Sequence, residues 1–278
     1  MITEVVLVRH GRTGYNVIHR LQGQIDIPLD IVGQWQADQT GMALAKRYYW
    51  AKVSDIATHP ERLVEHGAAA DGQADHSLWQ HAPAAARRLR VVSSDLIRAV
   101  QTAHAFADIL GLPVETNPAL RERSFGQWEG HTREEIDQMD HEAYVSWKSH
   151  MGGEAKYGVE SRQACGTRGA QALIEYLEAD AQNPTPCTLV VFGHGSWIAS
   201  TIEHCIGLEH DSNNGIGGVR NASWSRLTPY QRDNVWCWRL EDFNVNPVSL
   251  QGELDSEWDR GPSWIQSPNM DQWTPFTY

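Results

Sequence analysis

The sequence predicts an α/β fold in which helices cover both faces of a mostly parallel sheet. Short apolar runs recur along the 278-residue chain, and each is continuous rather than alternating, as at 5–8 and 189–192. Continuous apolar strands are typical of parallel sheets that are buried on both faces. Segments with helical spacing separate these runs, which is the pattern of βαβ units. We therefore expect a single α/β domain over residues 1–278.

The elements can be assigned in order along the chain. Each apolar run of four or five residues is assigned as a strand, and each longer segment with helical periodicity as a helix. The predicted strands are 5–8, 89–92, 113–116 and 189–192, and the predicted helices are 31–50, a segment after 92 that ends near 111, 161–182 and 197–207.

Residues at the helix ends and on one helix face support these assignments. Ser93, Ser94 and Asp95 are all suitable N-caps for the second helix, and Gly111 is a suitable C-cap. In the first helix, apolar side chains are available for an inner face, at Trp35, Met42, Leu44 and Ala45.

Two segments interrupt the alternation. Residues 59–88 are rich in Ala, His, Gly and Asp without a clear period, and we expect a loop insertion there. Residues 244–278 are polar but contain Trp258, Trp264 and Trp273. We expect this extension to pack on the domain, with its tryptophans as anchors.

Composition excludes several classes of protein. The net charge of −12 argues against a nucleic-acid partner, because such proteins usually carry a basic face. The four cysteines form no CxxC pair, which favours reduced thiols. No apolar run has the length of a membrane span. We expect no secretory leader, because the apolar run from Ile2 to Val8 is too short for the apolar region of a signal peptide. We expect a cytoplasmic protein without a membrane partner.

Positively charged and titratable side chains follow the predicted strands. Arg9 and His10 come directly after the first strand, the segment leading to Arg98 follows the second, and His194 follows the fourth. Ligands of parallel α/β sheets bind outside the carboxyl ends of the strands. An acidic protein with such a local cluster is suited to binding a small anion at that edge.

Five segments share their order and residues with one known family. On them the protein resembles the histidine phosphatase superfamily, which includes phosphoglycerate mutases and related phosphomonoesterases. The resemblance covers about 1–50, 90–131 and 155–243. The segments are LVRHGRTGYN (7–16), RLQGQIDIPLD (20–30), SSDLIRAVQTA (93–103), LRERSFGQWEG (120–130) and VVFGHGSWIAS (190–200).

The resemblance implies a role for each of five residues. His10 matches the nucleophile that becomes phosphohistidine, and its second ring nitrogen should donate to a main-chain carbonyl. Arg9 and Arg98 match the arginines that bind phosphate, and His194 matches a second histidine beside it. Glu122 matches the general acid, although Glu129 is a second carboxylate in the same turn.

Further positions correspond to family residues that contact phosphate or line the mouth of the site. Arg12 departs from the family pattern, and the sequence leaves open whether it reaches substrate or solvent. The implied substrate-binding residues are Thr13, Asn16, Gln22, Gly23 and Gly195.

The resemblance favours hydrolysis of a small phosphorylated metabolite over mutase activity. The family's mutases carry a tyrosine where this chain has Phe125, and a phenyl ring cannot donate that hydrogen bond. Arg133 is a possible basic contact, so a mutase remains an alternative, and a catalytically silent phospho-ligand binding protein is a weaker one. No cofactor is expected unless the mutase alternative holds, when 2,3-bisphosphoglycerate would be needed. A monomer or homodimer is expected.

Residues 131–157 are predicted to form a helical flap over the site. Trp128, Tyr144, Trp147 and Lys148 are its possible substrate contacts. No metal is expected, because arginines supply the electrostatics. The spacing of the histidines in the insertion also fits no compact set of metal ligands: His59, His66, His76 and His81.

Overall fold

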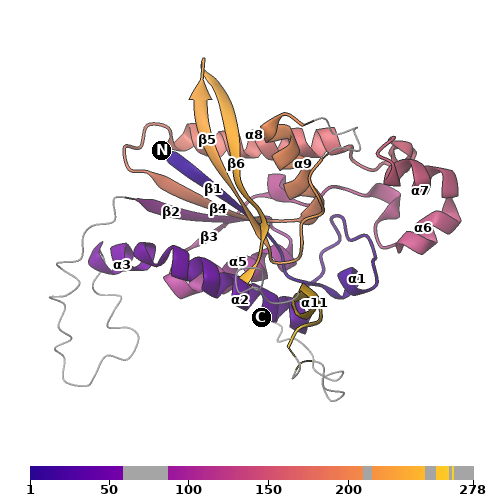
Figure 1. Cartoon of the computed structure of the whole chain (residues 1–278), viewed down its shortest axis with the longest axis horizontal. Helices are drawn as coiled ribbons and strands as arrows, with labels where there is room; N and C mark the ends of the chain where they lie inside the picture. Colours follow the sequence, from indigo (N-terminus) through magenta and orange to yellow (C-terminus); the bar gives the residue numbers. More distant parts are fainter. Residues whose placement is uncertain (59–86, 209–214, 248–254, 263–264, 266–278) are drawn as a thin grey trace.

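The computed structural model describes residues 1–58, 87–208, 215–247, 255–262 and 265 (Figure 1). Within them the strands form one six-stranded sheet, in the order β3-β2-β4-β1-β5-β6. The four predicted strands are present as β1 (Ile2–Arg9), β2 (Arg88–Ser93), β3 (Val114–Thr116) and β4 (Cys187–Gly193). Two further strands were not predicted, β5 (Trp224–Arg232) and β6 (Val235–Val245).

The sheet is mostly parallel, as predicted. Strands β1 to β4 run parallel to one another, whereas β5 is antiparallel to β1 and β6 is antiparallel to β5. In the register of the central strands, Arg9 lies beside Gly193 and Ser93 lies beside Phe192. The carboxyl ends of β1, β2 and β4 therefore meet at one edge, and the residues after them are brought together there.

Helices cover both faces of the sheet. On one face α2 (Ile31–Arg47) and α5 (Ile97–Leu110) enclose a core with Val6, Val8 and Val190. On the other, α8 (Arg162–Asp180) and α9 (Gly195–Ile206) enclose a core with Leu7 and Val191. Neighbouring residues of a strand contribute to opposite cores, which explains the continuous apolar runs.

The first two predicted helices differ in detail from the structure. The helix expected over 31–50 ends at its C-cap Tyr48, and α3 (Tyr49–Thr58) follows. Met42 was assigned to the inner face of that helix, but 54% of it is exposed, while Leu44 and Ala45 are buried. The expected inner face was therefore wrong at Met42.

The start of α5 also differs from the prediction. Its N-cap is Leu96, which has no capping side chain, rather than Ser93, Ser94 or Asp95. The Ile97 N–H instead donates to Asp26 Oδ1 at 2.7 Å. At the other end Gly111 adopts φ 70°, which confirms it as the C-cap.

The segment 131–157 forms a small helical unit with an apolar cluster of its own. It contains α6 (Arg133–Met139), α7 (His141–Lys148) and the 3₁₀ helix η4 (Gly153–Tyr157). Ile136 and Ala143 pack there against Phe125 and Trp128. Figure 1 shows α6 and α7 at the end of the molecule away from the N-terminus.

Near the end of the chain, Trp258 of α11 (Asp255–Arg260) is 1% exposed. Its ring centroid lies 5.4 Å from that of Trp35, and its Nε1–H donates to Asn221 O at 2.8 Å. Trp264, Trp273 and residues 59–86 lie outside the described residues, so the insertion and most of the extension remain predictions. Strand β6 includes Asn244 and Val245, which were assigned to that extension.

None of the helices in the described segments is long and apolar enough to span a bilayer.

Candidate active site

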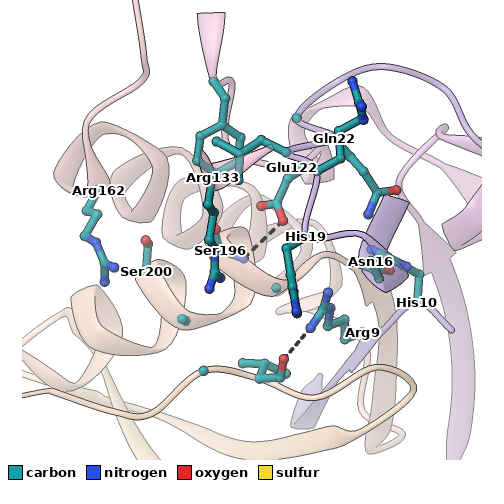
Figure 2. Close-up of a pocket in the computed structure, with 18 of the residues that line it drawn as sticks. Arg9, His10, Asn16, His19, Gln22, Glu122, Arg133, Arg162, Ser196 and Ser200 are labelled. Atoms are coloured by element: carbon teal, nitrogen blue, oxygen red, sulfur yellow. Dashed lines mark hydrogen bonds between the residues drawn. The ribbon is translucent and has the colours of Figure 1, made fainter. Parts of the chain in front are cut away.

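A pocket of about 460 Å³ lies at the carboxyl ends of β1 and β4. Its walls come from segments far apart in the chain, including the loop after β1, the turn that contains Glu122, the first turns of α9 and residues 216–219. Figure 2 shows these side chains converging on a common space. The edge where ligands bind in parallel α/β sheets is therefore hollow in this protein.

His10 lies in this pocket and is only 2% exposed. Its Nδ1 is 2.6 Å from the carbonyl oxygen of Gly11. Since a carbonyl can only accept, Nδ1 carries the proton and Nε2 keeps a free lone pair. Burial, then the positive charges of Arg98 and Arg9, lowers the pKa of His10 well below its usual value. The ring is therefore neutral at pH 7.

Arg98 and Arg9 lie beside His10, and both are anchored by main-chain carbonyls. The two terminal nitrogens of Arg98 donate to Ile25 O at 2.8 Å and to Gly23 O at 2.7 Å. Burial lowers the pKa of Arg98 to about 10, so it stays charged at neutral pH. Arg9 Nη1 donates to Val219 O at 2.5 Å. These anchors fix two guanidinium groups beside the His10 ring.

His194 is fully buried at the start of α9, where it occupies the N-cap position. Its ring centroid lies 5.2 Å from that of His10. Burial, with Arg98 as the next cause, lowers its pKa well below the usual value. Neither ring nitrogen has a hydrogen-bond partner among the described residues. His194 therefore lies next to His10, but it is not among the residues that line the pocket.

Glu122 lies in the pocket wall and is held by three main-chain N–H groups. Its Oε1 accepts from Arg123 and Trp197, both at 2.8 Å, and its Oε2 accepts from Ser196 at 3.1 Å. Glu129 instead accepts from the N–H of Phe125 within its own turn, and it does not line the pocket. Of the two carboxylates, Glu122 therefore lines the pocket and Glu129 does not.

Four of the five implied substrate-binding residues line the pocket: Asn16, Gln22, Gly23 and Gly195. A Cβ at Gly195 would lie 3.2 Å from Arg9 Nε, so glycine allows this close approach. Thr13 differs, because it is fully buried outside the pocket lining. It caps α1 (Gly14–Val17) and donates to Gln22 Oε1 at 3.0 Å. Its contribution to the site is therefore made through neighbouring residues.

Arg12, whose direction the sequence left open, points away from the pocket. Its Nε donates to Asp30 Oδ2 at 2.8 Å, and its Nη1 donates to Asp259 O at 2.8 Å. The charge of Arg12 is thus neutralised by Asp30, and the side chain connects the loop after β1 to α11.

Of the four proposed flap contacts, Trp147 lines the pocket, whereas Trp128 is buried and Lys148 is exposed. Arg133, the possible basic contact of the mutase alternative, also lines the pocket. Tyr144 packs against the flap's own cluster. Several lining residues were missed by sequence reasoning. The sequence indicated two of them in part, Ser196 and Ser200, because they follow His194 by two and six residues on α9. The missed residues are His19, Arg20, His150, Arg162, Ser196 and Ser200.

The pocket is strongly positive within an acidic chain. Its lining includes five arginines but one carboxylate, that of Glu122. In a chain of net charge −12, this concentration of one sign produces a local field that attracts anions. Across the described residues, no three or more His, Cys, Asp or Glu side chains are grouped to hold a metal.

Comparisons with known proteins agree with this geometry. A model of the histidine phosphatase superfamily (branch 1) matches residues 5–65 and 61–245. Glucosyl-3-phosphoglycerate phosphatase of Mycolicibacterium vanbaalenii is 30% identical over 257 residues, which are 88% of this chain and 96% of that protein. A probable phosphoglycerate mutase of Yersinia enterocolitica is 28% identical over 246 residues, which are 86% of this chain and 91% of that protein.

A solved structure shows the same similarity in three dimensions. Mycobacterial glucosyl-3-phosphoglycerate phosphatase in complex with VO3 is 28% identical to this chain, with a TM-score of 0.64. The match covers 88% of this chain and 100% of that one. The family model, the full-length relatives and the sheet topology all agree, and the chain belongs to the histidine phosphatase superfamily.

Proposed function

We propose that this phosphatase hydrolyses a phosphate monoester of a small metabolite through a phosphohistidine formed on His10. The observation that carries the proposal is the state of His10 itself. The ring is neutral, its Nδ1 is committed to Gly11 O, and Nε2 is free beside Arg9 and Arg98. A nucleophile with a free lone pair next to fixed cations is what attack on phosphorus requires.

In the first half-reaction, Nε2 of His10 forms a bond to phosphorus while the ester P–O bond breaks. The leaving alkoxide takes a proton from Glu122. A carboxyl group has about four acceptor sites, and the three N–H donors occupy two on Oε1 and one on Oε2. One site on Oε2 is left to carry the proton.

In the second half-reaction, Glu122 takes a proton from water as the water oxygen attacks phosphorus. The P–N bond breaks, phosphate leaves and His10 is restored. Arg9, Arg98 and His194 stabilise the negative charge on the transferring group throughout. Because these fixed donors supply the electrostatics, we propose that turnover needs neither a metal ion nor an organic cofactor.

The relatives suggest which substrate to test first. The M. vanbaalenii and mycobacterial proteins are named for glucosyl-3-phosphoglycerate. We propose a phosphorylated acid of this kind, acted on by a cytoplasmic monomer or homodimer.

A mutase is the second candidate, because relatives named as probable phosphoglycerate mutases match most of the chain. Phe125 lies in the pocket wall, where its ring supplies no hydroxyl for substrate. This favours hydrolysis over return of the phosphoryl group to a bound acid. A catalytically silent binding protein is also disfavoured. Loss of catalysis would usually remove one of the reactive residues, whereas His10, Arg9, Arg98 and His194 are all present and lie close together.

The test is a release assay on purified protein treated with a chelator. Phosphate release from p-nitrophenyl phosphate and from glucosyl-3-phosphoglycerate is expected, with an acid-labile phosphoprotein in quenched reactions. The variant His10→Ala should abolish both signals. Efficient conversion of 3-phosphoglycerate that depends on 2,3-bisphosphoglycerate, with little hydrolysis, would establish the mutase instead. Binding of phosphate esters without any turnover would establish the silent protein.

A further inference from the structure

The pocket has a second cationic region away from His10. Figure 2 shows Arg162 and Ser200 at one end of the pocket and His10 with Asn16 at the other, with Arg133 and Glu122 between them. All of these residues line the same cavity. The space is therefore larger than a phosphoryl group needs, and the two ends are built from different elements.

The arginines differ in how they are held. Arg9, Arg20 and Arg98 donate to main-chain carbonyls, so much of their hydrogen-bonding capacity is used within the protein. Arg162 and Arg133 make no hydrogen bond or ion pair in the described part of the chain. The N–H groups of half-buried Arg162 and of exposed Arg133 therefore remain available to an anion in the cavity.

Arg162 lines the pocket from a partly buried position. Arg162 is the first residue of α8 and is half-buried. Burial, with Arg123 as the next cause, lowers its pKa, whereas the nearby carboxylates of Glu203 and Glu154 act in the opposite direction. An arginine stays protonated at neutral pH in spite of this, so its charge is present but incompletely solvated. An anionic partner would recover the interaction that burial removes.

We propose that Arg162, with Arg133 and Ser200, forms a second anion subsite that binds a carboxylate of the substrate. This proposal rests on the proposed function and specifies its substrate class: phosphate monoesters that carry a carboxylate in addition to the phosphoryl group. The guanidinium fork of Arg162 matches the two oxygens of a carboxylate, and the Ser200 hydroxyl is a further donor. The phosphoryl group itself is bound by Arg9 and Arg98 at the His10 end.

The test uses two esters that differ only at the second group. 3-Phosphoglycerate has a carboxylate where glycerol 3-phosphate has a hydroxymethyl group. Charge-assisted hydrogen bonds correspond to about ten- to hundredfold in affinity. We expect kcat/KM to be higher for 3-phosphoglycerate by about that factor, mainly through KM. In Arg162→Gln the ratio of the two kcat/KM values should fall at least tenfold, while Arg162→Lys recovers part of it.

A matched control is Arg232→Gln, which removes one positive charge from a side chain that is 81% exposed at the end of β5. The ratio should not change in this variant. An equal loss on both esters in Arg162→Gln, or an unchanged ratio, would overturn the subsite.

Binding separates the subsite from the proposed function. In His10→Ala, calorimetry should show tighter binding of 3-phosphoglycerate than of glycerol 3-phosphate, and adding Arg162→Gln should remove the difference. If wild type hydrolyses p-nitrophenyl phosphate but this difference is absent or independent of Arg162, the subsite is wrong and the function stands. If the difference depends on Arg162 but no ester is hydrolysed, the function is wrong and the subsite stands.

Discussion

Replacing Glu122 with glutamine tests the assignment of the proton donor. The amide has nearly the same shape but cannot deliver a proton to a leaving alkoxide. Alkyl phosphates, whose leaving groups are strongly basic, depend on that proton, and general acid catalysis is worth about 10²–10⁴-fold. We expect kcat/KM for an alkyl phosphate to fall by this factor in Glu122→Gln. For p-nitrophenyl phosphate, whose leaving group is stable as an anion, the loss should be about tenfold or less.

The contacts of Glu122 also predict a cost in stability. The carboxylate accepts from three N–H groups, two at Oε1 and one at Oε2. An amide has a single oxygen, so its NH₂ group must face at least one of these donors. A buried donor left without an acceptor costs about 1–3 kcal/mol. Urea denaturation should show a decrease of this size in the free energy of unfolding.

The assay is a series of esters with leaving groups of graded basicity, compared between wild type, Glu122→Gln and Glu129→Gln. The loss in Glu122→Gln should grow steadily with leaving-group basicity. Glu129 does not line the pocket, so its variant should show no such trend. A uniform loss across the series in Glu122→Gln would refute the acid role, and it would indicate that the side chain only supports the start of α9.

Three further outcomes are expected. Arg98→Ala should lower kcat/KM by about 10³-fold in the phosphate-release assay, with Arg98→Lys intermediate, because lysine keeps the charge but not both carbonyl anchors. Burial keeps His194 neutral in the folded state, whereas the unfolded chain takes up a proton below about pH 6.5. The free energy of unfolding should therefore fall between pH 7.5 and 5.5, by up to about 1.4 kcal/mol per pH unit for this group, and urea titrations should show a shallower fall in His194→Gln. Trp258→Ala should reduce stability by about 3–5 kcal/mol in the same assay, since its ring is buried; a loss below 1 kcal/mol would show that α11 packs only loosely.

The parts of the fold that depend on local patterns were predictable. Continuous apolar runs specified the buried strands, and the residues after them located the pocket, because neighbouring parallel strands end at the same edge. The details that failed depend on distant partners. The start of α5 was misassigned because Asp26, from a loop about 70 residues earlier, accepts from the Ile97 N–H that a local cap would otherwise bind.

The site could be predicted to a similar extent. Each residue of the cluster around His10 lies in a sequence motif and could be located from it. Arg162 lies in no such motif, because it follows an ordinary N-cap serine at the start of an amphipathic helix. Only the packing of α8 against α9 places it near the pocket. Thr13 shows the opposite case, where a residue within a strong motif supports Gln22 rather than reaching the cavity.

The central position of β1 has a consequence for how the protein is made. Val5 pairs with Leu189 on one side and with Leu227 on the other, so β1 is synthesised before both of its neighbours and lacks them until residue 227 has been added. Such long sequence separations slow folding and prolong the exposure of an apolar strand. His10 follows this strand directly, and nascent chains that end before Leu227 should therefore lack an organised site around the proposed nucleophile.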